Sequence, residues 1–263
     1  MDLSVYRVRL RALGSIRLDK FPGIPLEGAL TGGVREVSCA CSADAAPGDC
    51  PIGHHCAYHL LARPTADLFD SLPKRYGTPP PPLVLRPRFP PGTYSPGSEL
   101  ELQVVLAGRA QEHFRWVLAG LVAAGRRGVG PIRNGSREDG RFEVGRIEAV
   151  GPEATLALSG GIRPESLPRA WRYPDDFSGP AHPGSFSDTF TVELRSPTLI
   201  EKKGFSRGTL EFSDLIGSLG KRVSLLSTGY GTGNLVDYTE HMRLKGLADE
   251  VTLDAKACEW REW

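Results

Sequence analysis

The chain has 263 residues, with 32 basic and 31 acidic side chains and a formal net charge of +1 at pH 7. Its 40% hydrophobic and 8% aromatic content is ordinary for a globular protein and excludes the disordered and collagen-like classes. A near-neutral chain has no global field that attracts nucleic acid, so a nucleic-acid site would have to be a local patch.

The basic residues are 25 Arg and seven Lys. Arginine binds phosphates and stacks on bases, which suits RNA, although a GC-rich genome would give the same bias. The sequence contains no run of about 18 apolar residues, and its N-terminus is too charged for a signal peptide. We therefore expect a cytoplasmic protein with no membrane partner, built from two domains of about 100–130 residues.

The first 39 residues predict a strand followed by a helix. Residues 5–10 alternate apolar and basic side chains, so Tyr6, Val8 and Leu10 should face the core, with Arg7 and Arg9 outward. After Pro25, apolar residues recur at helical spacing and predict a short helix that ends near Cys39; they are Leu26, Leu30, Val34 and Val37.

Residues 56–150 predict the rest of a ferredoxin-like domain. We interpret residues 56–62 as a second strand, 73–97 as a proline-rich connection without regular structure, and 98–106 as a half-buried strand. A helix should follow, because apolar residues recur at helical spacing, and residues 142–150 should close the sheet. The order β-α-β-β-α-β is ferredoxin-like. The helix positions are Phe114, Val117, Leu118, Leu121 and Val122.

The C-terminal part predicts a second β-α unit. Residues 151–184 are rich in Pro, Gly and Asp and are interpreted as a linker, 186–194 as a strand, and the tail 251–263 as one more strand. A second helix is predicted by Phe212, Leu215, Ile216, Leu219 and Val223. The predicted fold class is thus α+β, with tandem ferredoxin-like (RRM-like) domains at 1–150 and 185–263, the second one shortened.

The turn at residues 125–130, Gly-Arg-Arg-Gly-Val-Gly, is the first candidate RNA site. Glycines let a phosphate approach the backbone, and arginines supply the opposite charge. A nucleotide-binding P-loop is excluded, since no G-x-x-x-x-G-K-[ST] occurs. A helix C-cap with a flexible turn is the alternative. The candidate phosphate ligands are Arg126, Arg127, Arg133 and Arg137.

The order of several segments resembles the CRISPR precursor-RNA-processing endoribonucleases of the RAMP superfamily. These segments are LEGALTGGVREVSC, the Cys-rich loop (39–56), CAYHLLA, YSPGSELELQVVL and the Gly/Arg turn, with LRSPTLIEKKG and CEWREW later. The resemblance implies two ferredoxin-like domains that bind the repeat hairpin of precursor CRISPR RNA. It also implies metal-independent cleavage by the 2′-hydroxyl, giving a cyclic phosphate and a 5′-hydroxyl, and continued binding of the guide RNA among other effector-complex subunits.

Catalytic residues are expected among the cations, because the first predicted helix carries no histidine, the usual base of that family. Arg35, Arg17 and Lys20 would surround one phosphate, with Arg243 facing them, as in the arginine-dependent type IV branch. Arginine cannot serve as a general base at neutral pH, so slow cleavage is expected. A non-catalytic RAMP subunit that only binds guide RNA is the alternative. Lys202, Lys203 and Arg207 are further candidate RNA ligands.

The loop between residues 39 and 56 contains four cysteines. Zinc binds four sulfur or nitrogen ligands in a tetrahedron, so Cys39, Cys41, Cys50 and Cys56 form a possible structural site, although their spacing matches no standard C-x2-C pair. Free thiols are the alternative. His54 or His55 could instead carry protons in catalysis. No cofactor is required for the expected cleavage, and a zinc-loop interaction module is the third hypothesis for the chain.

Overall fold

A computed structural model describes residues 1–41, 50, 52, 55–65, 69, 79–130, 140–151, 155–158, 171–172, 211–231, 233 and 238–253. Its centre is an antiparallel sheet with the strand order β3-β5-β1-β6-β7, and β8 pairs with β1 beyond this path. The strands are β1 (Asp2–Ala12), β3 (Leu83–Pro87), β5 (Glu99–Ala107), β6 (Phe142–Val150), β7 (Thr155–Leu158) and β8 (Trp171–Arg172).

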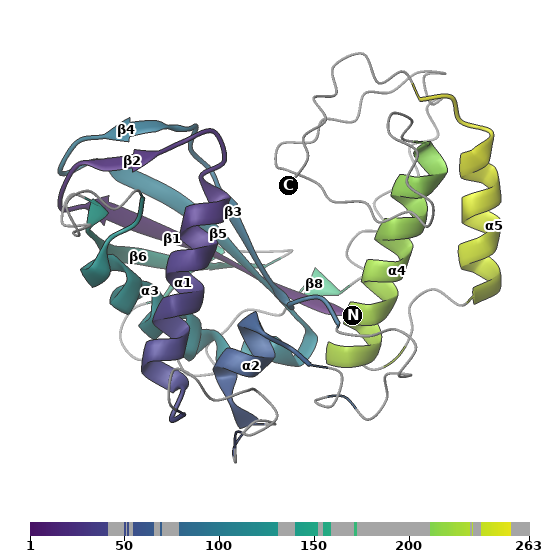
Figure 1. The fold of residues 1–263 in the computed structure, drawn as a ribbon, viewed down its shortest axis with the longest axis horizontal. Helices are drawn as coiled ribbons and strands as arrows, with labels where there is room; N and C mark the ends of the chain where they lie inside the picture. Colours follow the sequence, from purple (N-terminus) through teal and green to yellow (C-terminus); the bar gives the residue numbers. More distant parts are fainter. Residues whose placement is uncertain are drawn as a thin grey trace.

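Two helices connect these strands in the ferredoxin-like way. Helix α1 (Gly23–Ser38) lies between β1 and β3 in the chain, and α3 (Phe114–Arg127) lies between β5 and β6, preceded by the 3-10 helix η5 (Gly108–His113). The central order β3-β5-β1-β6 is that of a split βαβ fold. The predicted α+β, ferredoxin-like class is therefore confirmed for this domain (Figure 1).

The second strand of the fold was predicted in the wrong segment. Residues Ala57–Ala62 form the short helix α2, and the second strand of the sheet is β3, inside the stretch interpreted as an irregular connection. Five residues of α2 are buried, and a short, fully buried apolar run has the same pattern in a helix as in a strand. Pro87 is tolerated because it ends β3, an edge strand.

A second, two-stranded sheet lies beside the first. It pairs β2 (Ile16–Leu18) with β4 (Gly92–Tyr94) in antiparallel register, so Arg17 is opposite Thr93. Ile16 and Leu18 are buried and Arg17 is exposed between them, because successive side chains of a strand point to opposite faces. This small sheet fixes the position of Arg17 opposite Thr93.

The core lies between the sheet and the two helices. Tyr6, Val8 and Leu10 of β1 are at most 1% exposed, as predicted, and the Tyr6 ring stacks on Phe114 of α3 at 3.5 Å between ring centroids. Alternate β5 residues complete this face of the sheet; they are Leu100, Leu102, Val104 and Leu106.

Helices α1 and α3 pack with their backbones in contact. A Cβ built on Gly33 would lie 2.0 Å from the Gly120 carbonyl oxygen, and one built on Gly120 would lie 2.6 Å from Val34 Cγ2. Only residues without a side chain fit at such a crossing. The Thr-Gly-Gly stretch that weakens α1 as an isolated helix is thus what lets it dock on α3.

Two more helices follow, α4 (Phe212–Tyr230) and α5 (Tyr238–Asp249). Helix α4 was predicted, but its buried contact comes from its C-terminal end, since Leu219 is 50% exposed and Tyr230 only 2%. The Tyr230 ring meets Phe69 at 4.9 Å, and its hydroxyl donates to the Leu60 carbonyl at 3.4 Å. Helix α4 is therefore joined to the core of the sheet domain.

Other predictions for the C-terminal part have different outcomes. The strand at 186–194 and tail residues 254–263 lie outside the described residues. The predicted linker contributes β7 and β8 to the sheet, because short segments with alternating apolar residues can extend an antiparallel edge. Within the described part of the chain, no helix is long and apolar enough to cross a membrane.

Candidate nucleic-acid interface

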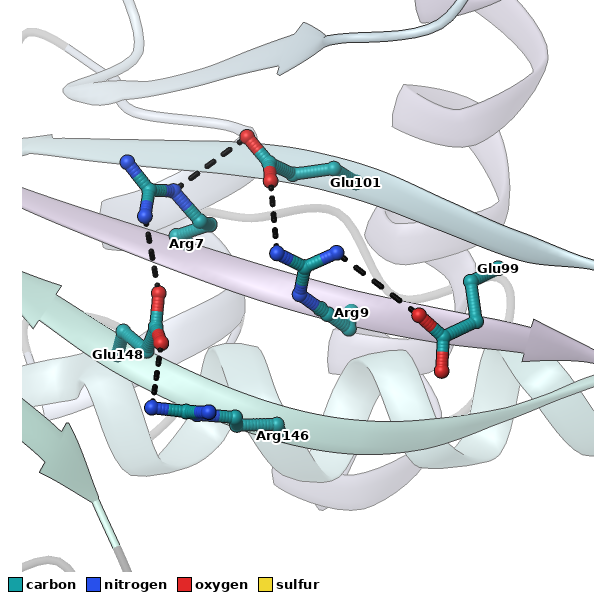
Figure 2. A network of polar contacts seen from close by, with 6 residues as sticks. All are labelled: Arg7, Arg9, Glu99, Glu101, Arg146 and Glu148. Atoms are coloured by element: carbon teal, nitrogen blue, oxygen red, sulfur yellow. Dashed lines mark hydrogen bonds and ion pairs between the residues drawn. The ribbon is translucent and has the colours of Figure 1, made fainter.

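The face of the sheet opposite the helices carries charged side chains in rows. Arg7, Arg9 and Arg11 alternate with the core residues of β1, which confirms the predicted outward direction of the first two. Cross-strand register places glutamates of β5 and β6 next to them (Figure 2). We call this set the sheet face; its acidic members are Glu99, Glu101, Glu143 and Glu148.

Glu148 is the centre of the sheet face. It is only 8% exposed, and its carboxylate accepts from Arg7 Nη1 at 3.0 Å and from Arg146 Nη2 at 2.9 Å. Arg146 reaches this position through a β-bulge, because Gly145 and Arg146 of β6 together face Arg9 of β1. Arg7 also contacts Glu101, with 3.4 Å between Nε and Oε1. Glu101 also lies 3.5 Å from Arg9, so Glu148 and Glu101 each bridge two guanidiniums.

The sheet face is unsuited to stacking bases. RRM proteins bind RNA through aromatic rings on this surface of the fold. Here the outward positions of β1, β3, β5 and β6 are charged, aliphatic, Gln or small, and none of them is aromatic. Their arginines bond to glutamates of the same face. Base stacking on this face is therefore disfavoured.

The Gly/Arg turn packs against β2. Gly128 has φ 81° and its N–H donates to the Ala124 carbonyl at 2.9 Å, so it ends α3 as a C-cap. Gly130 has φ 105°, and a Cβ on it would lie 2.7 Å from the Arg17 carbonyl oxygen. The local structure therefore explains why both positions are glycine: Gly128 ends the helix with a positive φ, and Gly130 packs too closely on β2 for a side chain. Their close packing also brings the turn beside Arg17, which sequence spacing did not predict.

Three cations belong to this turn or to the segment that packs on it and leads to α1, and we call them with Gly128 and Gly130 the basic end. Arg126 is exposed at the end of α3. Arg17 is 55% exposed in its side chain and lies 3.3 Å from Asp19. Lys20 lies just before α1, with its Nζ 5.5 Å from the centre of the Phe21 ring. An RNA phosphate approaching the turn would meet these groups from β2, α1 and α3.

Arg127 has a different role from its neighbour Arg126. Its guanidinium donates to the Ala29 carbonyl at 3.2 Å and lies 3.4 Å from Glu36, both on α1. It therefore holds the two helices together, and a phosphate would have to compete with these contacts, so its role as a phosphate ligand stays a prediction. Arg133 and Arg137, like the further candidates Lys202, Lys203 and Arg207, lie outside the described residues.

The predicted catalytic cations lie on different segments of the fold. Arg35 lies twelve residues along α1 from Gly23, a rise of about 18 Å at 1.5 Å per residue, whereas Arg17 and Lys20 precede that helix. Its guanidinium stands 5.7 Å from the Tyr58 ring of α2. A shared phosphate for these three cations stays a prediction.

Arg243 also lies away from the basic end. It is on α5, which packs on α4 and lies on the far side of α4 from the sheet (Figure 1). Two of its nitrogens bond to Glu240 at 2.7 Å, which lowers the pKa of that carboxyl and raises that of the arginine. His54, the candidate base, lies outside the described residues.

His113 was missed by the sequence analysis. It ends η5, and among the described residues none bonds to its buried Nδ1. Burial is the main cause of its lowered pKa, and the charges of Arg115 and Arg109 add to it. It is the N-cap of α3 and therefore lies at the opposite end of that helix from the Gly/Arg turn. No spacing motif marked it in the sequence.

The cysteines lie where α1 ends and α2 begins. Cys39 is the C-cap of α1, Cys56 is the N-cap of α2, and the Cys41 and Cys50 sulfurs are 2.9 Å apart. The pKa of Cys41 is raised to about 11, mainly by its bond with Cys50, then by desolvation and the charges of Cys50 and Cys39. No group of three metal-ligating side chains in the described part of the chain is already arranged around one ion.

The fold and these surfaces define a class: a ferredoxin-like α+β domain with a charged sheet face, a basic end and an attached C-terminal helical part. The chain belongs to the AF_1859_N family, whose model is described as an N-terminal domain and matches residues 1–165. No curated protein matches the sequence. Among solved structures it is similar to the Csm3–Csm4 subcomplex of the type III-A CRISPR–Cas interference complex. That match has 11% identity and a TM-score of 0.38, and it covers 59% of this chain and 80% of that chain.

Proposed function

We propose that this chain is an RNA-binding RAMP-type protein of a CRISPR system that holds guide RNA by its phosphate backbone at the basic end. The observation that carries the proposal is the close packing of Gly130 on the Arg17 carbonyl oxygen, which brings the end of α3 beside β2, and exposed arginines lie on both segments. The CRISPR assignment comes from the resemblance in the order of sequence segments. In that order the second strand of the sheet is β3, and the segment first interpreted as this strand is α2.

Electrostatics favour the basic end over the sheet face. A phosphate that binds Arg7 must compete with Glu148 at 3.0 Å, a carboxylate that is only 8% exposed. Arg126 is exposed, and the carboxylate beside Arg17, that of Asp19, is itself 74% exposed. Phosphate contacts at exposed cations release counterions and make the affinity depend on salt.

The test compares two adjacent arginines. Arg126→Ala should weaken binding of the CRISPR repeat hairpin about tenfold and reduce the salt dependence by about one counterion. Arg127→Ala is the matched control, because that guanidinium is bonded to α1, and its RNA affinity should stay within about twofold. Fluorescence anisotropy over a range of KCl concentrations measures both. Equal losses in the two variants, or none in either, would contradict the proposal.

Cleavage is a separate proposal, in which Arg17 and Lys20 stabilise negative charge while the RNA 2′-hydroxyl attacks the adjacent phosphate. The P–O5′ bond then breaks, the products are a 2′,3′-cyclic phosphate and a 5′-hydroxyl, and water supplies the proton to the leaving 5′-oxygen. The described residues of the basic end contain no group that titrates near neutral pH, so deprotonation would rest on solvent and turnover would be slow. Incubation in EDTA with a normal repeat RNA and with one carrying a 2′-deoxy at the cut site tests it. Cutting of the normal RNA alone supports cleavage; binding of both without cutting leaves the RNA-holding role.

A further inference from the structure

Four cysteine side chains form a series of contacts that links the end of α1 to the start of α2. The Cys56 thiol lies 4.0 Å from the carbonyl oxygen of Ser38, next to Cys39. The Cys39 thiol lies 3.9 Å from the Cys41 carbonyl oxygen, and the Cys41 sulfur is 2.9 Å from that of Cys50. Four of the five cysteines of the chain therefore gather at one place.

The four cysteines are the ligand types of a zinc centre, but the distances between their sulfurs are not those of a metal-bound site. A tetrahedral zinc ion with sulfur ligands at about 2.3 Å separates these sulfurs by about 3.8 Å. The 2.9 Å between Cys41 and Cys50 is shorter than this and longer than the roughly 2.0 Å of a disulfide. The two sulfurs would need to separate by about 1 Å to share an ion. The other two sulfurs would have to move toward them, since no ready-made metal group is found among the described residues.

The electrical environment supports a cation at this place. Zinc binds cysteines as thiolates and displaces their protons when it binds, and its charge offsets the repulsion between the bound sulfurs. Within the described part of the cluster, no lysine or arginine bonds to any of the four sulfurs.

We propose that Cys39, Cys41, Cys50 and Cys56 bind one structural zinc ion that clamps the C-terminus of α1 to the N-terminus of α2. The clamp would fix Arg35 of α1 over Tyr58 of α2, which are 5.7 Å apart. It would also support the α2 carbonyl of Leu60, to which Tyr230 of α4 donates. A zinc ion here would therefore stabilise the attachment of the C-terminal helices, independently of any RNA.

The test measures metal in the whole chain purified with reductant from zinc-supplemented cells. We expect one zinc per chain by mass spectrometry of the elements, with most of it lost in Cys41→Ser and in Cys56→Ser. Cys258→Ser is the matched control and should keep its zinc, since Cys258 is the one cysteine of the sequence that is not among the four proposed ligands. Because these variants can misfold, cobalt replacement in the wild type gives a second measurement, and tetrahedral thiolate bands are expected.

Three results would overturn the proposal. One is a reduced, folded wild-type protein that retains no zinc and gives no tetrahedral cobalt spectrum. Another is equal loss of zinc in Cys258→Ser, which would mean that the metal is bound elsewhere or without specificity. The third is a metal-free wild type that is lighter by two hydrogens when reductant is omitted, which would assign Cys41 and Cys50 to a disulfide instead.

Discussion

Replacing Glu148 by Gln should destabilise the domain more than the same change at any other glutamate of the sheet face. The Glu148 side chain is 10% exposed, and its two partners are Arg7 at 3.0 Å and Arg146 at 2.9 Å. Removing one member of a buried ion pair costs about 3–5 kcal/mol. Because the arginine side chains are 33% and 63% exposed and can turn to water, we discount this to about 2 kcal/mol.

Glu143 provides the matched control on the same strand. Its side chain is 51% exposed, and its ion pair with Arg11 has a longer distance of 3.6 Å. Glu143→Gln should therefore lower the free energy of unfolding by less than about 0.5 kcal/mol. Urea unfolding followed by circular dichroism gives both values, with an unchanged m-value expected. Equal losses in the two variants would refute the conclusion that burial, and not the ion pair alone, makes Glu148 important.

Three further predictions concern the core. Gly33→Ala should destabilise the chain by more than about 2 kcal/mol, because the new Cβ would clash with the Gly120 carbonyl oxygen. Gly28→Ala is the control on the same helix: its Cβ would meet nothing within 4 Å, so it should stabilise the chain by about 0.5–1 kcal/mol. Thermal unfolding measures both variants. Burial raises the pKa of Tyr6 to about 12 from 10.0, so the stabilisation by its protonated form is complete below pH 10 and is lost as the pH rises toward 12. At about pH 11 the free energy of unfolding of the wild type should have fallen by about 1 kcal/mol, a loss that Tyr6→Phe should not show. Urea unfolding at a series of pH values measures this difference. Tyr230→Ala should cost about 3–4 kcal/mol and Tyr230→Phe less than about 1 kcal/mol, because most of the contact is ring burial; equal costs would show that the hydroxyl is what matters.

The regular strands were predictable because their two faces differ. In β1 and β5 an apolar residue alternates with a charged or polar one, and this period of two occurs only when one face is buried. Helix α2 and strand β3 lack such a contrast. Nearly all of α2 is buried, and β3 is short, next to prolines and at the sheet edge. Their assignment needed the tertiary structure.

The candidate site was predictable in composition but not in arrangement. The Gly/Arg turn was found from its residues, yet Arg126 and Arg127 are adjacent in sequence and differ in role, because successive residues of a helix point about 100° apart. The pairing of Glu148 with Arg7 depends on the register of β1 with β6 and on a bulge, and neither is encoded in a local pattern.

The near-zero net charge of the chain is consistent with a basic RNA site because the two signs are unevenly distributed. On the sheet face, glutamates of β5 and β6 neutralise the arginines of β1. At the basic end, Arg126 is exposed on a turn whose glycines are fixed by packing. The arginines of β1 therefore stabilise the fold through ion pairs, while the cations of the basic end are available to a phosphate. If this reasoning is right, raising the salt concentration should weaken RNA binding long before it weakens the partly buried ion pairs of the sheet face.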